Sequence, residues 1–123
     1  MTDVTELADR YIAVWNETDG DRRRALIAKT WAEDGAYADP AAASNGHDGI
    51  DKMTAAVHER FPGARFQRTS AVDQHNDRIR FGWELRAADG ETLIVAGVDF
   101  GVVAKDGRLA SITGFFGELA EAA

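Results

Sequence analysis

The sequence predicts an α+β fold in which helices occupy the first half of the chain and strands the second half. Apolar residues recur at helical spacing three times before residue 62, whereas apolar and polar residues alternate over most of the remainder. A meander of long antiparallel strands must curl, so we expect the three N-terminal helices to close its concave side. The predicted result is a cone-shaped, curved antiparallel sheet with an interior cavity, in a single domain spanning residues 1–123.

Composition describes an ordinary globular protein and limits its partners. The 123 residues are 45% hydrophobic and 28% charged, which is enough for one core. The formal net charge of -7 argues against a nucleic-acid partner. The chain has no cysteine, its first residues are acidic, and it lacks the run of about 20 apolar residues that a membrane span needs. We therefore expect a soluble cytoplasmic protein without thiol chemistry.

Amphipathic spacing and turn residues predict the boundaries of the helices. Residues 3–17 form the first helix, the second begins at Asp21 and ends at Gly35, and the third runs from its cap Asp48 to Pro62.

Alternation between apolar and polar residues predicts the strands that follow. Beyond a short extended stretch after Gly35, strands are expected at residues 64–74, 78–86, 92–104 and 109–116. The strand at 92–104 is almost wholly apolar, so we expect it to be central and covered on both faces.

The stretch from Trp31 to Pro40 carries the first candidate site residues. Alternation places Tyr37 and Asp39 on one face of the extended segment, where a phenol and a carboxylate could form the floor of a pocket. The alternative is a polar edge strand that ends in an Asp-Pro turn.

Asp99 is the only charged residue within the apolar strand at 92–104. Period 2 places it on the same face as Gly97 and Gly101, and two small residues beside a buried carboxyl leave volume for a ligand. Burial without a cationic partner favours the protonated acid, which would donate a hydrogen bond at neutral pH. The alternative is an ion pair with an arginine of a neighbouring strand, such as Arg80.

Tyr11 lies on the apolar stripe of the first helix. It is either a core residue or a phenol directed at a ligand. Several large apolar side chains must fill the core, and a surplus could line the cavity. The candidate ligand-binding residues are Trp15, Trp31, Tyr37, Met53, Val57, Phe61, Gly97 and Phe116.

Metal and cofactor signatures are missing from the sequence. His47, His58 and His75 show no close metal-ligand spacing, and His75 is expected to be exposed. The chain contains no phosphate loop, nucleophile elbow or dinucleotide fingerprint. We therefore predict neither a metal nor a cofactor.

Five stretches together resemble one known superfamily over nearly the whole chain. They are Arg10 to Ala13, Trp31 to Pro40, Gly49-Ile50, Gly97 to Phe100, and Gly107 to Gly117. This combination resembles the SnoaL-like branch of the nuclear transport factor 2-like fold. The resemblance implies a homodimer and a pocket for a hydrophobic small molecule such as a steroid or a polyketide. It does not specify a reaction, because the scaffold hosts isomerases, cyclases, hydratases, epoxide hydrolases and plain binders.

Ketosteroid isomerase is the closest mechanistic parallel within that superfamily. The resemblance implies that Asp39, in its Asp-Pro pair, is a general base that removes a proton beside a carbonyl. Tyr11 and Asp99 would then donate hydrogen bonds to the developing enolate. Tyr37 could hydrogen-bond Asp39, which would stabilise the charged form and weaken it as a base.

Three other functions stay open at this point. A polyketide cyclase-like enzyme would use an acid/base aspartate on bulky fused-ring substrates. A non-catalytic protein would bind a hydrophobic molecule in the same cavity. An interaction module would use its sheet face, although the polar row Arg78, Arg80, Glu84 and Arg86 disfavours this unless a dimer covers it.

Overall fold

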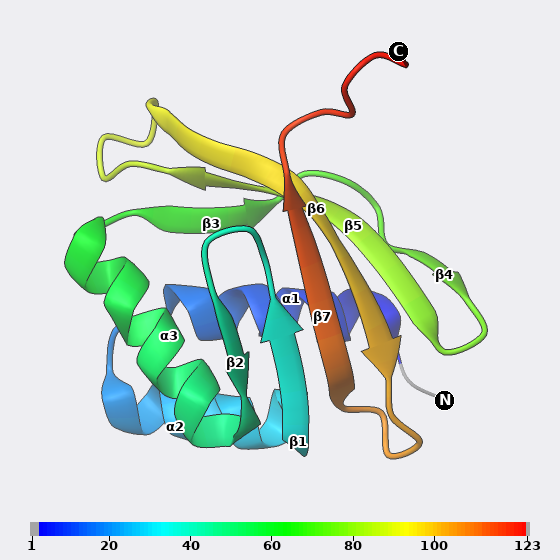
Figure 1. Cartoon of the computed structure of the whole chain (residues 1–123). Helices are drawn as coiled ribbons and strands as arrows, with labels where there is room; N and C mark the ends of the chain where they lie inside the picture. The colour runs from blue at the N-terminus through cyan, green and yellow to red at the C-terminus, as the bar shows by residue number, and fades with distance from the viewer. Residues whose placement is uncertain (1–2, 123) are drawn as a thin grey trace.

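The computed structural model describes residues 3–122, which form three helices and one curved seven-stranded sheet (Figure 1). This confirms the predicted α+β class. In chain order the elements are α1 (Val4–Asn16), α2 (Gly20–Thr30), β1 (Trp31–Ala38), β2 (Ala43–Asn45), α3 (Gly46–Arg60), β3 (Arg65–Arg68), β4 (Asp73–His75), β5 (Arg78–Arg86), β6 (Leu93–Val103) and β7 (Leu109–Phe116).

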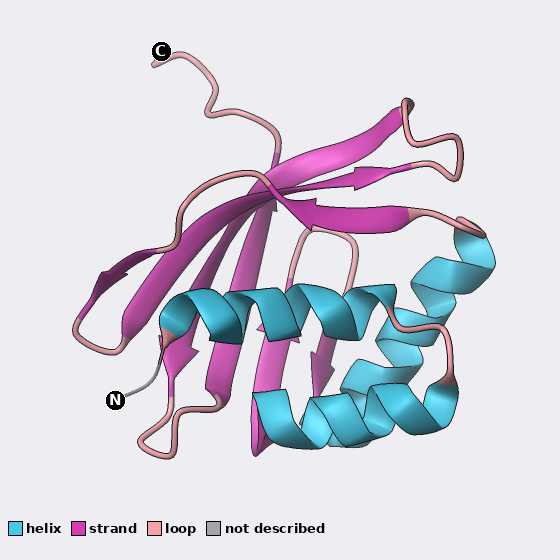
Figure 2. Ribbon diagram, turned by 180° about the vertical axis from the view of Figure 1, so that it is seen from behind, coloured by secondary structure: helices cyan, strands magenta, loops and turns pink. Residues whose placement is uncertain are grey.

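The sheet is mixed and stays open. Its strand order is β2-β1-β7-β6-β5-β3, and β4 pairs with β5 beside β3. Every pairing is antiparallel except that of β1 with β7, which is parallel. Figure 2 shows the three helices on one side of the curved sheet, so the layers form the predicted cone-like arrangement. The parallel pairing is a correction to the expected antiparallel sheet.

The first helix and the inward faces of the strands build the core. Asp3 caps α1, because its carboxylate accepts hydrogen bonds from the backbone of Thr5 at 3.0 Å and Glu6 at 3.2 Å. The predicted strands 78–86 and 109–116 are confirmed with the same bounds as β5 and β7. The largest fully buried side chains include Trp31, Tyr11, Phe81, Leu7, Ile27, Ile50, Leu109 and Ile112.

The second helix ends earlier than predicted. Strand β1 begins at Trp31, and the helix does not reach Gly35. The register of β1 against β7 shifts between Trp31 and Ala36, which marks a bulge. Gly35 lies against the Trp31 ring, since a Cβ there would be 2.6 Å from its Cε3 atom. Residues 31–35, predicted as the end of the helix, are therefore the irregular first part of β1.

The segments around the third helix also differ from the prediction. Helix α3 begins at Gly46, and its N-cap Asn45 makes no side-chain capping bond, so Asp48 is a first-turn residue and not the cap. The Asp48 carboxylate in the first turn still interacts favourably with the helix dipole. The segment before α3, where no strand was predicted, contains β2, which pairs with β1. The single strand predicted at 64–74 is divided into β3 and β4.

Strand β6 is central but is covered on one face only. Asp99 on its inward face is 3% exposed, whereas Phe100 on its outward face is 44% exposed. Phe115 on β7, which pairs with Val98 of β6, is 56% exposed. The prediction that both faces are covered is therefore wrong for this chain, because all three helices lie on the inner side. Among residues 3–122, no helix is long and apolar enough to cross a membrane.

Candidate functional site

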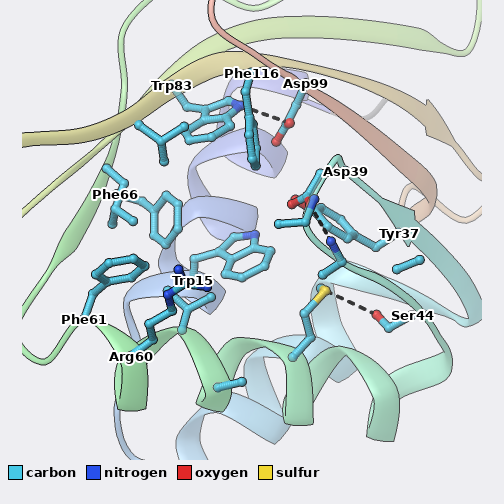
Figure 3. A pocket seen from close by; sticks show the side chains of 18 of the residues that line it. Trp15, Tyr37, Asp39, Ser44, Arg60, Phe61, Phe66, Trp83, Asp99 and Phe116 are labelled. Carbon is cyan, nitrogen blue, oxygen red and sulfur yellow. Dashed lines mark hydrogen bonds between the residues drawn. The ribbon is translucent and has the colours of Figure 1, made fainter.

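A cavity of about 740 Å³ lies between the helices and the concave face of the sheet. Its walls come from α1, the end of β1, the β1–β2 loop, α3 and strands β2, β3, β5, β6 and β7. Figure 3 shows aromatic side chains around this space and two carboxyl groups at one side of it. This size suits a small organic ligand, and the lining is mostly apolar.

Asp99 projects from β6 into this cavity and accepts two hydrogen bonds. Its Oδ2 atom accepts from the Tyr11 hydroxyl at 2.7 Å, and its Oδ1 atom accepts from the Trp83 indole N–H at 3.0 Å. Burial raises the pKa of Asp99 to about 6, although both hydrogen bonds oppose the rise. Arg80 pairs instead with Asp73 at 2.9 Å, so the alternative Asp99–Arg80 ion pair is not formed.

Tyr11 brings its hydroxyl to Asp99 from the opposite wall. Its side chain is 1% exposed and packs edge-on against Phe81, with ring centroids 5.8 Å apart. Burial raises the pKa of Tyr11 well above its ordinary value, and the negative charge of Asp99 raises it further. The phenol therefore keeps its proton and acts as a hydrogen-bond donor.

Asp39 follows β1 and both closes a turn and lines the cavity. Its Oδ1 atom accepts from the backbone N–H of Ala41 at 2.7 Å and of Ala42 at 2.8 Å. Its Oδ2 atom accepts from the Tyr37 hydroxyl at 2.5 Å. Burial raises the pKa of Tyr37, and the hydrogen bond to Asp39 raises it further. Tyr37 and Asp39 thus share the cavity face, and the turn interpretation holds as well.

Gly114 on β7 lies beside the side chains of both Asp99 and Asp39. A Cβ at this position would lie 2.7 Å from Asp99 Oδ1, 3.3 Å from Asp39 Cβ and 3.7 Å from the Tyr37 hydroxyl oxygen. Any larger side chain would displace these groups. The sequence reasoning missed Gly114, although period 2 from Ile112 to Phe116 places it on the inward face.

Six of the eight predicted ligand-binding residues line the cavity, namely Trp15, Tyr37, Met53, Val57, Phe61 and Phe116. Trp31 does not, because its ring is 1% exposed in the core behind Tyr11. Gly97 does not either, since the ring of Trp83 and the Phe115 carbonyl occupy the space beside it. Likewise Ile79 and Ile112 fill the space beside Gly101. The open volume that the sequence predicted near these glycines lies elsewhere.

Two further features of the cavity were not anticipated. Trp83, which was not among the predicted ligand-binding residues, lines the cavity and donates a hydrogen bond to Asp99. Lys52 and Arg60 of α3 stand at the exposed mouth among otherwise small or apolar lining residues of this helix. Both residues follow the helical spacing of Met53 and Val57, which were predicted to bind the ligand. The sequence could therefore have placed Lys52 and Arg60 on the same face of α3.

Two of the three histidines contact backbone carbonyl oxygens, and the third is exposed. The Nε2 atom of His58 is 2.6 Å from the Trp15 carbonyl oxygen, and that of His47 is 2.9 Å from the Trp31 carbonyl oxygen. His75 is exposed on β4. Between residues 3 and 122, no group of three or more His, Cys, Asp or Glu side chains is arranged to hold a metal ion.

Comparison with known proteins gives a family and a fold. The family model of the SnoaL-like domain matches residues 8–112. A candidate isomerase of the SnoaL-like family from Agrobacterium tumefaciens is 36% identical, with a TM-score of 0.87, and the match covers 93% of this chain and 97% of that one. No match was found among curated proteins.

More distant solved structures share the fold. An NTF2-like protein of unknown function from Exiguobacterium sp. 255-15 has a TM-score of 0.71 at 16% identity, over 92% of this chain and 99% of that one. A candidate SnoaL-like polyketide cyclase from Jannaschia sp. CCS1 has a TM-score of 0.68 at 18% identity, over 91% and 85%. The fold is therefore the nuclear transport factor 2-like fold, and the chain belongs to the SnoaL-like family.

Proposed function

We propose that this SnoaL-like protein is an acid–base enzyme that removes a proton beside a carbonyl group of a hydrophobic small molecule, as an isomerase or a cyclase does. One observation carries the proposal. Two aspartates, Asp39 and Asp99, both lie beside Gly114 and line a cavity that is otherwise mostly apolar, and each accepts a hydrogen bond from a buried phenol. Paired carboxyl groups in different surroundings are suited to different roles in proton transfer.

Asp39 is the proposed general base. Its Oδ2 atom accepts one hydrogen bond, from Tyr37, and a carboxylate oxygen has two lone pairs, so one lone pair is available to a substrate C–H. The backbone bonds from Ala41 and Ala42 hold the carboxylate in position. When the proton moves to Asp39, the C–H electron pair forms the carbon–carbon double bond of the enolate, and the π pair of the carbonyl moves onto its oxygen. Return of the proton to another carbon completes an isomerisation.

Tyr11 and Asp99 are the proposed stabilisers of the enolate oxygen. The Tyr11 hydroxyl donates to Asp99, so its single hydrogen is occupied. Protonated Asp99 can donate to the Tyr11 oxygen, which frees the Tyr11 hydrogen for the substrate oxygen. A pKa of about 6 makes this protonated form accessible near neutral pH.

The test compares wild type with Asp39→Asn in the isomerisation of 3-cyclohexenone, followed by the ultraviolet absorbance of the conjugated product. Loss of a general base should reduce kcat/KM by about 10²- to 10⁴-fold. Asp34→Asn is the matched control, because Asp34 is an exposed carboxylate on β1, the strand that Asp39 follows, and does not line the cavity. Equal rates for wild type and Asp39→Asn would reject the proposal.

A second candidate is a non-catalytic binder of a hydrophobic molecule, of the steroid or polyketide kind. The two backbone hydrogen bonds that Asp39 accepts from Ala41 and Ala42 close the β1–β2 turn, which gives the carboxylate a structural reason to be present. A binder would keep ligand-dependent thermal stabilisation in Asp39→Asn and lose it in Ala56→Trp, which fills the cavity from the exposed side of α3. Filling from Gly97 is unsuitable, because the Phe115 carbonyl blocks that position.

The same proposal includes a homodimer formed through the outer face of the sheet. Phe100 and Phe115 are 44% and 56% exposed and pack edge to face, with ring centroids 6.1 Å apart. Val98 and Val102 extend this apolar outer face along β6. Light scattering should give twice the chain mass for wild type and one chain mass for Phe115→Lys. A monomeric wild type would contradict the dimer.

A further inference from the structure

Helix α3 presents one continuous stripe to the cavity, and cations stand near its two ends. Six residues of α3 line the cavity at helical spacing, namely Gly49, Lys52, Met53, Ala56, Val57 and Arg60. The buried residues of the helix, Ile50 and Thr54, lie beside this stripe. The stripe runs for about 16 Å along the helix axis, and about 12 Å of this separates the two cationic positions.

These two cations lack the carboxylate partners that most arginines of the described chain have. Seven arginines form ion pairs with aspartate or glutamate. Within residues 3–122, neither Lys52 nor Arg60 forms such a pair. This is notable in a chain with a formal net charge of -7, where carboxylates outnumber cations. An anion at the cavity mouth would therefore meet uncompensated positive charge.

Arg60 is placed at the side of the cavity away from the carboxyl groups. Its guanidinium carbon lies 5.2 Å from the centroid of the Phe61 ring, a cation–π contact that leaves its N–H groups free for an acceptor. Figure 3 shows Arg60 and Phe61 at one side of the cavity and Asp39 and Tyr37 at the other. Between them lie apolar side chains, including Trp15 and Phe66.

We propose that the ligand is an elongated hydrophobic carboxylate, or a comparable anion, whose charged group binds Arg60 at the cavity mouth with support from Lys52. Asp39 and Asp99 repel an anion from the other end, so such a ligand enters in one orientation. Its uncharged end then reaches the carboxyl groups. The choice of a carbonyl for that end rests on the proposed function, whereas binding of the anion does not.

A structural explanation of Arg60 must be separated from this one. Arg60 and His58 lie in the last turn of α3, where positive charge interacts favourably with the helix dipole. Such a role would make Arg60→Gln less stable but would not affect the choice between charged and neutral ligands. The readout is therefore ligand preference, with thermal stability measured in parallel.

The experiment measures Kd by titration calorimetry for 4-(2-naphthyl)butanoate and for its uncharged primary amide. Wild type should bind the carboxylate about five- to tenfold more tightly than the amide at low salt, and 0.5 M NaCl should reduce this preference. Arg60→Gln should bring the ratio of the two affinities close to one and leave the amide affinity unchanged. Lys52→Gln should reduce the ratio by a smaller factor.

Arg65→Gln is the matched control, because Arg65 is exposed on β3 and does not line the cavity. It should keep the wild-type ratio. The proposal is overturned if wild type binds neither compound, shows no preference for the carboxylate, or keeps its preference in Arg60→Gln. Turnover does not enter this test. A preference for the carboxylate without ketone isomerisation would reject the proposed enzyme and retain the anion site. Ketone isomerisation without a preference for the carboxylate would reject the anion site and retain the proposed enzyme.

Discussion

The Tyr11 hydroxyl donates a 2.7 Å hydrogen bond to Asp99 Oδ2 across the cavity, joining α1 to the centre of the sheet. The two residues are 88 positions apart in the chain. Asp99 receives a second bond from Trp83, so both of its oxygens are satisfied as acceptors. This arrangement stabilises the ionised carboxylate, while burial favours the protonated one. The balance at a pKa of about 6 gives the site a proton that can be exchanged near neutral pH.

The folding stability should depend on pH through Asp99. Its pKa rises from 3.8 to about 6 in the folded chain, so folding favours the protonated form. The resulting stabilisation is complete below about pH 4 and is lost as pH rises through 6, a change of about 3 kcal/mol. Urea unfolding of wild type and Asp99→Asn at several pH values measures it. As pH falls from 7 to 4, the free energy of unfolding of wild type should increase relative to that of Asp99→Asn. Parallel curves of unfolding free energy against pH would contradict the raised pKa of Asp99.

Removing the Tyr11 hydroxyl should raise the pKa of Asp99 further. In Tyr11→Phe, Oδ2 loses its donor, and this donor opposes the rise in pKa in the wild type. The free energy of unfolding at pH 7 should fall by about 1–3 kcal/mol because a buried acceptor is left unpaired. A ¹³C NMR titration of the Asp99 carboxyl reports the pKa directly. Tyr37→Phe is the control, because Tyr37 donates to Asp39 and not to Asp99.

Adding one methyl group at Gly114 should disrupt the site. The new Cβ would be 2.7 Å from Asp99 Oδ1, so Gly114→Ala must displace the carboxyl. We expect a loss of about 1–3 kcal/mol in stability and a large loss of turnover. Gly20→Ala is the control, because a Cβ there meets its nearest atom at an ordinary 3.5 Å, at the start of α2. Wild-type stability and turnover in Gly114→Ala would show that the two carboxyl groups do not depend on this close approach.

The pH dependence of catalysis should identify which form of Asp99 is active. If protonated Asp99 supplies the hydrogen bond, kcat/KM should rise as pH falls from 8 towards 6, because the protonated fraction increases through a pKa of about 6. Asp99→Asn has an N–H donor that does not titrate in this range, so the rise should disappear. A rise that persists in Asp99→Asn would assign the ionisation to another group.

Local patterns in the sequence predicted the elements with uninterrupted periodicity. The alternation over residues 78–86 and 109–116 gave β5 and β7, and the face assignment of Asp99 follows from period 2 alone. Tyr11 was placed on a buried stripe for the same reason. These features depend only on neighbours in the chain, which is why the sequence predicted them well.

The features that the sequence did not predict depend on contacts between distant segments. The parallel pairing of β1 with β7 and the bulge at Gly35 are set by tertiary packing. The placement of Asp39 and Asp99 beside Gly114 involves three separate strands or their ends. The space near Gly97 was filled by Trp83, a side chain from the adjacent strand. The period-2 alternation of one strand shows which side chains share a face. It does not show how side chains of the neighbouring strands fill the space beside a glycine.

Exchange of α protons for deuterium is the most direct measure of the central claim, because it reports proton removal without requiring a particular product. Cyclohexanone in D₂O with catalytic amounts of protein can be followed by ¹H NMR. Wild type should speed the loss of the α-proton signal well beyond buffer, and Asp39→Asn should return the rate to within about tenfold of buffer. Exchange in wild type at the buffer rate, or an undiminished rate in Asp39→Asn, would contradict Asp39 as the base.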